Sequence, residues 1–148
     1  MKFVLTQTAE IEASVEGVWA AWSNVAAFAE WDPREIATKI DGPFQVGATG
    51  WSKQRGNPRA PFRITAVAAP HAWSSECPLP GGRLEISHLV EEIGGGRVRV
   101  TKTYTAHGPM TFAFRLHFGR RIRKQMPASF AALGARTRHL GQLRVGKP

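Results

Sequence analysis

Acidic residues are missing from the C-terminal part of the chain. All 11 Asp and Glu lie between Glu10 and Glu92, whereas residues 93–148 contain no acid and carry 12 of the 20 Lys and Arg. Such a segment cannot neutralise its own charge, so it faces the acidic half, solvent with counterions, or an anionic partner such as nucleic acid or a membrane surface. A solvated basic face and a basic docking face both fit the sequence.

Cysteine and long apolar runs are also scarce. The single Cys77 excludes an internal disulfide and a zinc site built from several thiolates. No stretch approaches the roughly 18–20 apolar residues that span a bilayer, and Thr6 and Gln7 interrupt the short apolar start before it could form a signal sequence. We therefore expect a cytoplasmic protein without a transmembrane segment.

Recognisable sites for metals, phosphates and nucleophilic catalysis are missing too. The five histidines show no i, i+4 pair and no neighbouring ligands at metal-binding spacing, so neither a metal nor a cofactor is expected. Residues 42–49 have the spacing of a P-loop, but Ala48 stands where the lysine must be and Pro43 lacks an amide donor. No Gly-x-Ser-x-Gly sequence occurs, and Cys77 has no activating neighbours.

The chain does contain enough apolar material for one core. It has 148 residues, 43% of them hydrophobic, with five Trp and eight Phe. This length supports one domain of ordinary size and is too short for two that each bury a core of their own. We expect a single domain over residues 1–148.

The apolar spacing predicts an α+β protein. Residues 3–11 are typical of a strand, and Ser14 is a suitable N-cap for a helix with apolar residues at 15, 18, 19 and 22. A second helical turn should end at Asp32-Pro33, because the residue before proline avoids helical geometry. Segments 36–40, 44–53, 61–67, 73–77, 83–92 and 97–106 predict an antiparallel meander. A helical stripe follows at Met126, Phe130, Leu133, Leu140 and Leu143, and the proline at 127 predicts a break between about residues 119 and 127.

The last two predicted strands form a hairpin around three glycines at 94–96. Period-two alternation places Leu84, Ile86, His88 and Val90 on one face together with Val98, Val100, Lys102 and Tyr104. A three-residue turn would set His88 opposite Lys102 and Ile86 opposite Tyr104. Three polar groups then line an otherwise apolar inner face. They are either satisfied core residues or groups that face a cavity, and core packing is the commoner situation.

The order of these elements, together with several short stretches, resembles the START-like, Bet v 1-like (SRPBCC) superfamily, in the branch of polyketide cyclase/dehydrase and lipid-transport proteins. The matching stretches are IEASVEGVWAAW at 11–22, FAEWDP at 28–33, GPFQVG at 42–47 and GPM at 108–110. They cover nearly the whole chain and are chiefly structural. The resemblance implies a helix-grip fold, in which a curved antiparallel sheet wraps around a long C-terminal helix, with two short helices after the first strand.

The resemblance also implies a mainly apolar cavity that opens near the two short helices and binds small hydrophobic ligands. Aromatic side chains suit the walls of such a pocket, although any one of them is more often plain core. Trp51 shares a strand face with Lys53 and Arg55, as a tryptophan and an arginine do in the aromatase/cyclase branch, but these residues also fit an exposed hairpin end. The candidate ligand-binding residues are Trp31, Trp51, Trp73, His88, Lys102, Tyr104, Met110 and Phe130.

Two functions fit these observations. The first is binding of a small hydrophobic ligand of polyketide, lipid or aromatic type, with cyclase or dehydratase activity as an extension if His88 or Tyr104 exchanges protons with it. The second is a basic interaction module that docks on RNA, on the ribosome or on an anionic membrane surface. Salt separates them, because counterion release weakens nucleic-acid binding steeply while uptake into an apolar cavity barely responds.

Overall fold

The computed structural model describes residues 2–145 and the side chains of residues 2–140. Seven antiparallel strands form one sheet in the order β1-β7-β6-β5-β4-β3-β2. The strands are β1 (Lys2–Glu12), β2 (Glu35–Asp41), β3 (Thr49–Gln54), β4 (Ala60–Ala68), β5 (Ala72–Leu79), β6 (Gly82–Gly94) and β7 (Arg97–His107). The helical segments are α1 (Val15–Ser23), the 3₁₀ turn η1 (Val25–Ala27), α2 (Phe28–Trp31), α3 (Thr111–Ala113), the π-helical turn η2 (Phe114–Phe118) and α4 (Gly119–Val145).

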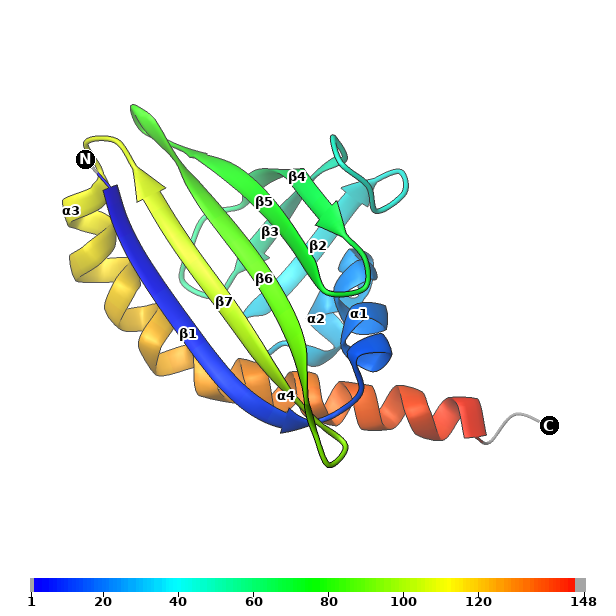
Figure 1. The fold of residues 1–148 in the computed structure, drawn as a ribbon. Helices are drawn as coiled ribbons and strands as arrows, with labels where there is room; N and C mark the ends of the chain where they lie inside the picture. The colour runs from blue at the N-terminus through cyan, green and yellow to red at the C-terminus, as the bar shows by residue number, and fades with distance from the viewer. Residues whose placement is uncertain (1, 146–148) are drawn as a thin grey trace.

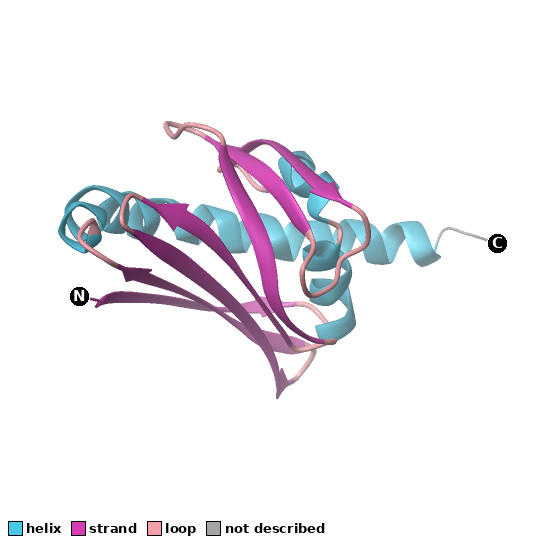
Figure 2. Cartoon of the chain, turned by 90° about the horizontal axis from the view of Figure 1, so that it is seen from above, coloured by secondary structure: helices cyan, strands magenta, loops and turns pink. Residues whose placement is uncertain are grey.

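The sheet is strongly curved, and α4 runs across the side towards which it curls (Figures 1 and 2). Helices α1 and α2 lie together at the other end of the sheet from α3. This arrangement confirms the helix-grip fold that the sequence predicts. No helix in the described part of the chain is long and apolar enough to cross a membrane.

The two short helices follow the local signals in the sequence. The Ser14 side chain accepts a hydrogen bond from the Gly17 amide at 3.0 Å, so it caps α1. The apolar stripe of α1 is buried at Val15, Val18 and Trp22. Helix α2 ends at Trp31, directly before the Asp-Pro pair, as expected. Helices as short as α1 and α2 are not stable in isolation, so they depend on packing against the rest of the protein. Each large apolar side chain that becomes buried contributes about 1.5–3 kcal/mol to that packing.

The β6–β7 hairpin has the predicted register, reached by a different turn. His88 pairs with Lys102 and Ile86 with Tyr104. Residues 95 and 96 form a two-residue turn, and a bulge at Ile93 supplies the extra residue that restores the register. The three glycines at 94–96 all have positive φ, a conformation that a tight hairpin needs and that a residue without a side chain adopts readily.

Two predicted boundaries were wrong. Strand β3 begins at Thr49 rather than at Phe44, because the chain turns first through Gly47, whose φ is +90°. No break occurs between residues 119 and 127: α4 is helical throughout, and the irregular turn lies earlier, at Phe114–Phe118. Pro127 is tolerated because it is exposed, so water can satisfy the carbonyl that loses its intrahelical partner.

The long helix packs its apolar stripe against the inner face of the sheet. Met126, Phe130 and Leu133 are buried there, Leu140 is half-buried, and the side chain of Leu143 lies outside the described residues. The fully buried valines of β6 and β7 face this stripe. The sheet and α4 thus share one apolar core, and the pocket described below is a gap in it.

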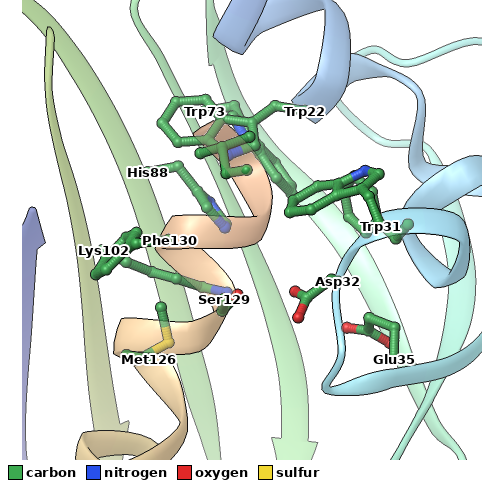
Figure 3. Close-up of a pocket in the computed structure, with 12 residues that line it drawn as sticks. Trp22, Trp31, Asp32, Glu35, Trp73, His88, Lys102, Met126, Ser129 and Phe130 are labelled. Carbon is green, nitrogen blue, oxygen red and sulfur yellow. The ribbon is translucent and has the colours of Figure 1, made fainter. Parts of the chain in front are cut away.

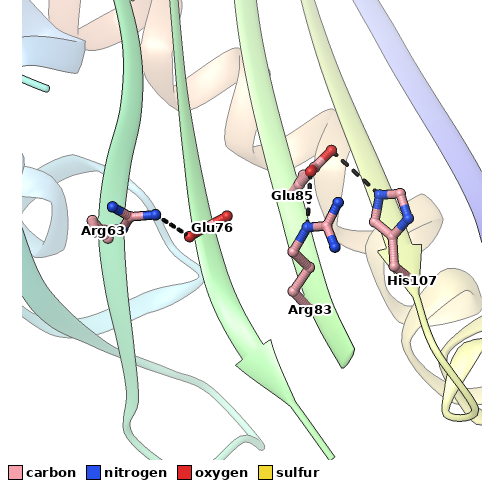
Figure 4. Close-up of polar contacts among 5 residues, drawn as sticks. All are labelled: Arg63, Glu76, Arg83, Glu85 and His107. Atoms are coloured by element: carbon pink, nitrogen blue, oxygen red, sulfur yellow. Dashed lines mark hydrogen bonds and ion pairs between the residues drawn. The ribbon is translucent and has the colours of Figure 1, made fainter. Parts of the chain in front are cut away.

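Several charged side chains of the strands form ion pairs within the sheet, and these include Arg97 and Arg99 from the acid-free segment. Glu76 pairs with Arg63 at 2.6 Å, and Glu85 lies 3.0 Å from Arg83 and 3.4 Å from His107 (Figure 4). On β7 and β1, Arg97 and Arg99 pair with Glu12 and Glu10 at 3.7 and 3.2 Å. Four carboxylates of the strands, at Glu10, Glu12, Glu76 and Glu85, are therefore paired with basic residues of the sheet. On α4, only Arg136 reaches an acid within the described residues, Glu30 at 3.7 Å.

Candidate functional site

A small pocket separates α4 from the inner face of β5, β6 and β7, and α1, α2 and the start of β2 complete its walls. Its free volume is about 40 Å³, which is room for one or two water molecules. One side is aromatic and the other is polar (Figure 3). The lining residues are Trp22, Phe28, Trp31, Asp32, Glu35, Trp73, His88, Lys102, Met126, Ser129, Phe130 and Leu133.

The aromatic side is built around a stack of two rings. The His88 imidazole lies parallel to the Trp73 indole, with centroids 3.9 Å apart and planes 2° apart. Trp22 of α1 meets His88 edge-on at 5.4 Å. Phe28 and Trp31, both from α2, contact each other edge-to-face at 5.7 Å and are only half-buried. The aromatic wall therefore has a rigid part on the sheet and a less buried part on the short helix.

The polar atoms of this aromatic wall are incompletely satisfied. Nδ1 of His88 and Nε1 of both Trp31 and Trp73 are buried without a hydrogen-bond partner among the described residues. Burial, together with the nearby positive charge of Lys102, lowers the pKa of His88 well below its usual value, so the imidazole is neutral. Buried polar groups normally find partners, so unpaired atoms at a pocket wall are the ones that a ligand or water would satisfy.

The polar side sets one ammonium against two carboxylates. Figure 3 shows Lys102 extending from β7 beside Ser129 towards the side of the pocket that holds Asp32 and Glu35. Within the described residues, no ion pair of 4.0 Å or less joins Lys102 to either carboxylate. A donor and acceptors thus face each other across the free volume without neutralising each other by direct contact.

The two carboxylates are held by their own elements. Glu35 accepts hydrogen bonds from Ser52 Oγ and Gln54 Nε2, both at 3.0 Å. Burial raises the pKa of Glu35, and these two donors partly oppose that rise. Asp32 Oδ1 accepts one hydrogen bond, from the Arg34 amide at 3.0 Å. Asp32 is consequently the carboxylate with more capacity left for a ligand.

Behind the pocket, Arg34 forms a buried network that ties β2 to β7 and α4. Its guanidinium donates to Tyr104 Oη at 2.9 Å, to Gln125 Oε1 at 3.3 Å and to Gln54 Oε1 at 3.3 Å. Burial alone would favour the neutral phenol, but Lys102 and Arg34 together hold the pKa of Tyr104 below its ordinary value. The hydroxyl of Tyr104 is thereby committed to Arg34 rather than directed into the pocket.

The structure brings five of the eight predicted ligand-binding residues to the pocket wall: Trp31, Trp73, His88, Lys102 and Phe130. Tyr104 lies beside it, in the Arg34 network. Trp51 lies on β3 with the Arg59 guanidinium 4.8 Å from its ring centroid, and Met110 is exposed before α3. Cys77 is half-buried on β5, and burial raises the pKa of its thiol to about 11.

The sequence analysis missed the charged residues at the start of β2. Asp32, Arg34 and Glu35 surround a proline between a helix end and a strand, which looks like an ordinary polar connection. All three are nonetheless buried. The strand pattern contained no signal for this burial, because alternation along Ile36, Thr38 and Ile40 would place Glu35 on the outer face. A bulge between Glu35 and Ala37 interrupts that alternation, and Glu35 is buried while Ile36 is exposed.

The fold is shared with known structures. A norcoclaurine synthase point mutant from Thalictrum flavum, in complex with a transition-state analogue, superposes with a TM-score of 0.75 at 12% identity, covering 95% of this chain and 97% of that one. A START superfamily protein from Mycobacterium smegmatis gives a TM-score of 0.70 at 14% identity, with coverage of 93% and 98%. The di-domain ARO/CYC protein BexL gives 0.67 at 15%, covering 92% of this chain and 48% of its own.

At these identities the structural matches establish the fold alone. No curated protein matches the chain in sequence. Nothing in the comparisons points to nucleic acid or an anionic surface as a partner of the basic C-terminal part. A family model described as polyketide cyclase / dehydrase and lipid transport matches residues 2–138. With nearly the whole chain matched, the protein belongs to the polyketide cyclase / dehydrase and lipid transport family.

Proposed function

We propose that the pocket binds a small hydrophobic molecule that has an aromatic body and an oxygen acceptor at one end. The observation that carries this proposal is Lys102, an ammonium that contacts no carboxylate of the described residues and faces the free volume opposite an aromatic wall. A carbonyl, enolate or carboxylate oxygen would accept from Lys102, while the ring system would lie against Trp73 and Trp31. Family membership supports a hydrophobic ligand of this general kind.

The closed pocket is too small for such a ligand, so binding requires an outward movement of part of the wall. At about 40 Å³ it falls far below the roughly 300 Å³ of a typical ligand site. Phe28 and Trp31 are the half-buried members of the wall, and they belong to a four-residue helix. Such a short helix is held by packing alone, so α2 is the element that opens at least cost.

Cyclase or dehydratase activity would use the same groups. Asp32 could take a proton from the carbon beside a bound carbonyl, and Lys102 would stabilise the negative charge that develops on the carbonyl oxygen. In cyclisation, the enolate carbon would form a bond to a second carbonyl carbon of the ligand, and the alkoxide formed there would take the proton back from Asp32. In loss of water, the C–O bond of a β-hydroxyl would break, and the hydroxyl would leave as water with that proton. Neither step needs a cofactor. The support for this extension is the placement of Asp32 and Lys102 on opposite sides of one small volume.

Binding of anilinonaphthalene sulfonate, an aromatic anion whose fluorescence rises in apolar sites, tests the ligand proposal. Lys102→Met keeps the side-chain length and removes the charge, and it should weaken dye binding about 10- to 100-fold, the usual value of a hydrogen bond to a charged group. Lys39→Met, at an exposed position of β2, is the matched control and should bind like the parent. Equal dye affinity in all three proteins would rule out Lys102 as the polar anchor. Native mass spectrometry of the purified protein would identify a ligand that copurifies.

A further inference from the structure

A second surface, remote from the pocket, combines exposed apolar side chains with unpaired positive charge. Phe112 is 66% exposed, Leu116 39% and Met110 38%, so three of the eight large apolar residues that are exposed in the described chain fall within seven positions. The basic side chains around them are all exposed as well. We call these residues the cationic face: Met110, Phe112, Leu116, Arg115, Arg120, Arg123 and Lys124.

Helix geometry makes four of these residues successive neighbours in a row that winds gradually around the helix. Leu116 follows Phe112 by four positions, Arg120 follows Leu116 by four, and Lys124 follows Arg120 by four. Residues at this spacing project from the same side of a helix. The row therefore has an apolar end at α3 and η2 and a basic continuation along the first turns of α4.

The exposed apolar residues are not needed for the core. The inward side of this segment is filled by Phe114, which is 3% exposed and lies 6.2 Å from Phe3 and 5.5 Å from Phe118 between ring centroids. Phe112 and Leu116 lie two positions before and after Phe114, so they project on the other side of the helix, where folding gains less from them because they stay more exposed. Exposed apolar side chains clustered among polar ones commonly mark an interaction surface.

The charges of the cationic face also lack acidic partners in the part of the chain that the structure describes. On β7, Arg97 and Arg99 pair with Glu12 and Glu10 of β1. By contrast, Arg115, Arg120, Arg123 and Lys124 make no ion pair of 4.0 Å or less within residues 2–140. Of the solvated-face and docking-face interpretations of the acid-free segment, docking is favoured here because apolar side chains accompany the charge.

We propose that the cationic face docks on the surface of an anionic phospholipid bilayer. The basic side chains would contact lipid phosphates, and Phe112 and Leu116 would enter the boundary between headgroups and acyl chains. RNA suits the face less well, because Phe112 is the one aromatic side chain of the cationic face, and aliphatic Leu116 and Met110 offer nothing on which a base can stack. The face lies at the α3 end of the molecule, away from α1 and α2, so docking leaves the walls of the pocket free (Figure 1).

Cosedimentation with vesicles tests this proposal on the full chain. The protein should bind vesicles of equimolar phosphatidylglycerol and phosphatidylcholine, bind phosphatidylcholine vesicles weakly, and dissociate as salt is raised. Each basic residue near an anionic surface contributes about fivefold to affinity, so replacing Arg115, Arg120, Arg123 and Lys124 by Gln should lower binding by nearly three orders of magnitude, about 600-fold. Phe112→Ser with Leu116→Ser should lower it about tenfold or more.

Two matched controls separate the face from net charge and from general hydrophobicity. Replacing Lys39, Arg59, Arg63 and Arg83 by Gln removes the same charge from the sheet side and should change binding less than fivefold. Val46→Ser removes an apolar side chain that is 59% exposed in the β2–β3 connection and should have no effect. Equal losses in the face variants and their controls would overturn the proposal, as would equal binding to neutral vesicles. Binding to RNA without binding to anionic vesicles would also overturn it.

Discussion

The imidazole of His88 lies flat against the indole of Trp73, with ring centroids 3.9 Å apart and planes 2° apart. The two residues are directly paired across β5 and β6, so the stack follows from sheet register. A parallel stack of this kind excludes water from the two ring faces that meet. It also holds the imidazole at a buried position where its protonation is costly. The same contact therefore shapes the pocket wall and makes the stability of the fold depend on pH.

We expect the stability of the fold to fall as the pH drops below about 6.5, the unfolded value for histidine. The folded protein keeps His88 neutral in this range because of burial and the charge of Lys102, whereas the unfolded chain binds a proton there. The unfolded state thus holds more protons, and the free energy of unfolding decreases by up to about 1.4 kcal/mol per pH unit. Urea unfolding measured between about pH 7 and pH 5 checks the slope.

His88→Phe isolates this effect, because a phenyl ring can keep the stack but cannot be protonated. The variant should lose the part of the slope that His88 supplies. His117→Gln, at an exposed position of η2, should leave the slope of the parent unchanged. If His88→Phe has the same pH dependence as the parent protein, the neutral stacked imidazole is not its source.

A second prediction concerns Gly82, where strands β6 and β7 approach each other closely. A Cβ atom at Gly82 would lie 1.9 Å from the carbonyl oxygen of His107, a contact with backbone that no side-chain rotation can relieve. Gly82→Ala should therefore cost about 3 kcal/mol of unfolding free energy through displacement of the β6–β7 pair. Gly134→Ala in α4 is the contrasting variant, because its Cβ would meet only ordinary contacts of 3.5 Å and 3.7 Å with Arg138 and Ile11. It should raise stability by up to about 1 kcal/mol.

Chemical denaturation of both glycine variants gives the two numbers. A Gly82→Ala protein as stable as the parent would show that the strands separate there at no cost. Similar losses in both variants would mean that the contact with His107 is not what distinguishes Gly82 from Gly134.

The basic cluster at the start of α4 should contribute little to stability. Arg120, Arg123 and Lys124 are exposed and unpaired within the described residues, and Arg121 donates at 2.8 Å to Asn57 on an exposed loop. Exposed charges of this kind contribute about 0–1 kcal/mol. Replacing all four by Gln should shift the melting temperature by no more than a few degrees, measured by scanning calorimetry. A larger drop would show that these residues pair with the acidic half.

The fold could be predicted well because strand alternation, turns and helix caps depend on residues that are close together in the sequence. Alternation along β6 and β7 identified the inward face, and the register followed once the glycine turn was located. The same reasoning brought His88 and Lys102 to one wall of the pocket. It failed at Pro127, where the outcome depends on which side of α4 faces solvent, a tertiary property that helix propensity does not contain.

The buried charges were beyond local reasoning for a related reason. Arg34 looks like a surface arginine next to a proline until its acceptors are known, and those acceptors lie 20, 70 and 91 residues away along the chain. No spacing rule links such positions. For the same reason Tyr104, which alternation places on the inner face, could not be assigned to the pocket or to the core from the sequence.

The last prediction concerns the stability that the hydrogen bonds of Arg34 contribute. Arg34 is 6% exposed, and its guanidinium donates to Tyr104, Gln54 and Gln125. Arg34→Met keeps much of the volume and leaves these acceptors unpaired, so it should cost about 3–5 kcal/mol of unfolding free energy. Tyr104→Phe removes one acceptor only and should cost about 1–2 kcal/mol. Arg120→Met, at an exposed position of α4, should cost less than about 0.5 kcal/mol.

A double-mutant cycle then decides whether Arg34 and Tyr104 act through the 2.9 Å hydrogen bond that joins them. Because each single variant already breaks that bond, the double variant should cost less than the sum of the two, by about 1 kcal/mol or more. Additive losses would show that Arg34 stabilises the fold through its other partners alone. Dye binding measured on Tyr104→Phe adds a second readout. The Tyr104 hydroxyl is bonded to Arg34 and does not line the pocket, so the variant should bind the dye with the affinity of the parent. A weaker affinity for the dye would instead place Tyr104 among the residues that hold the ligand.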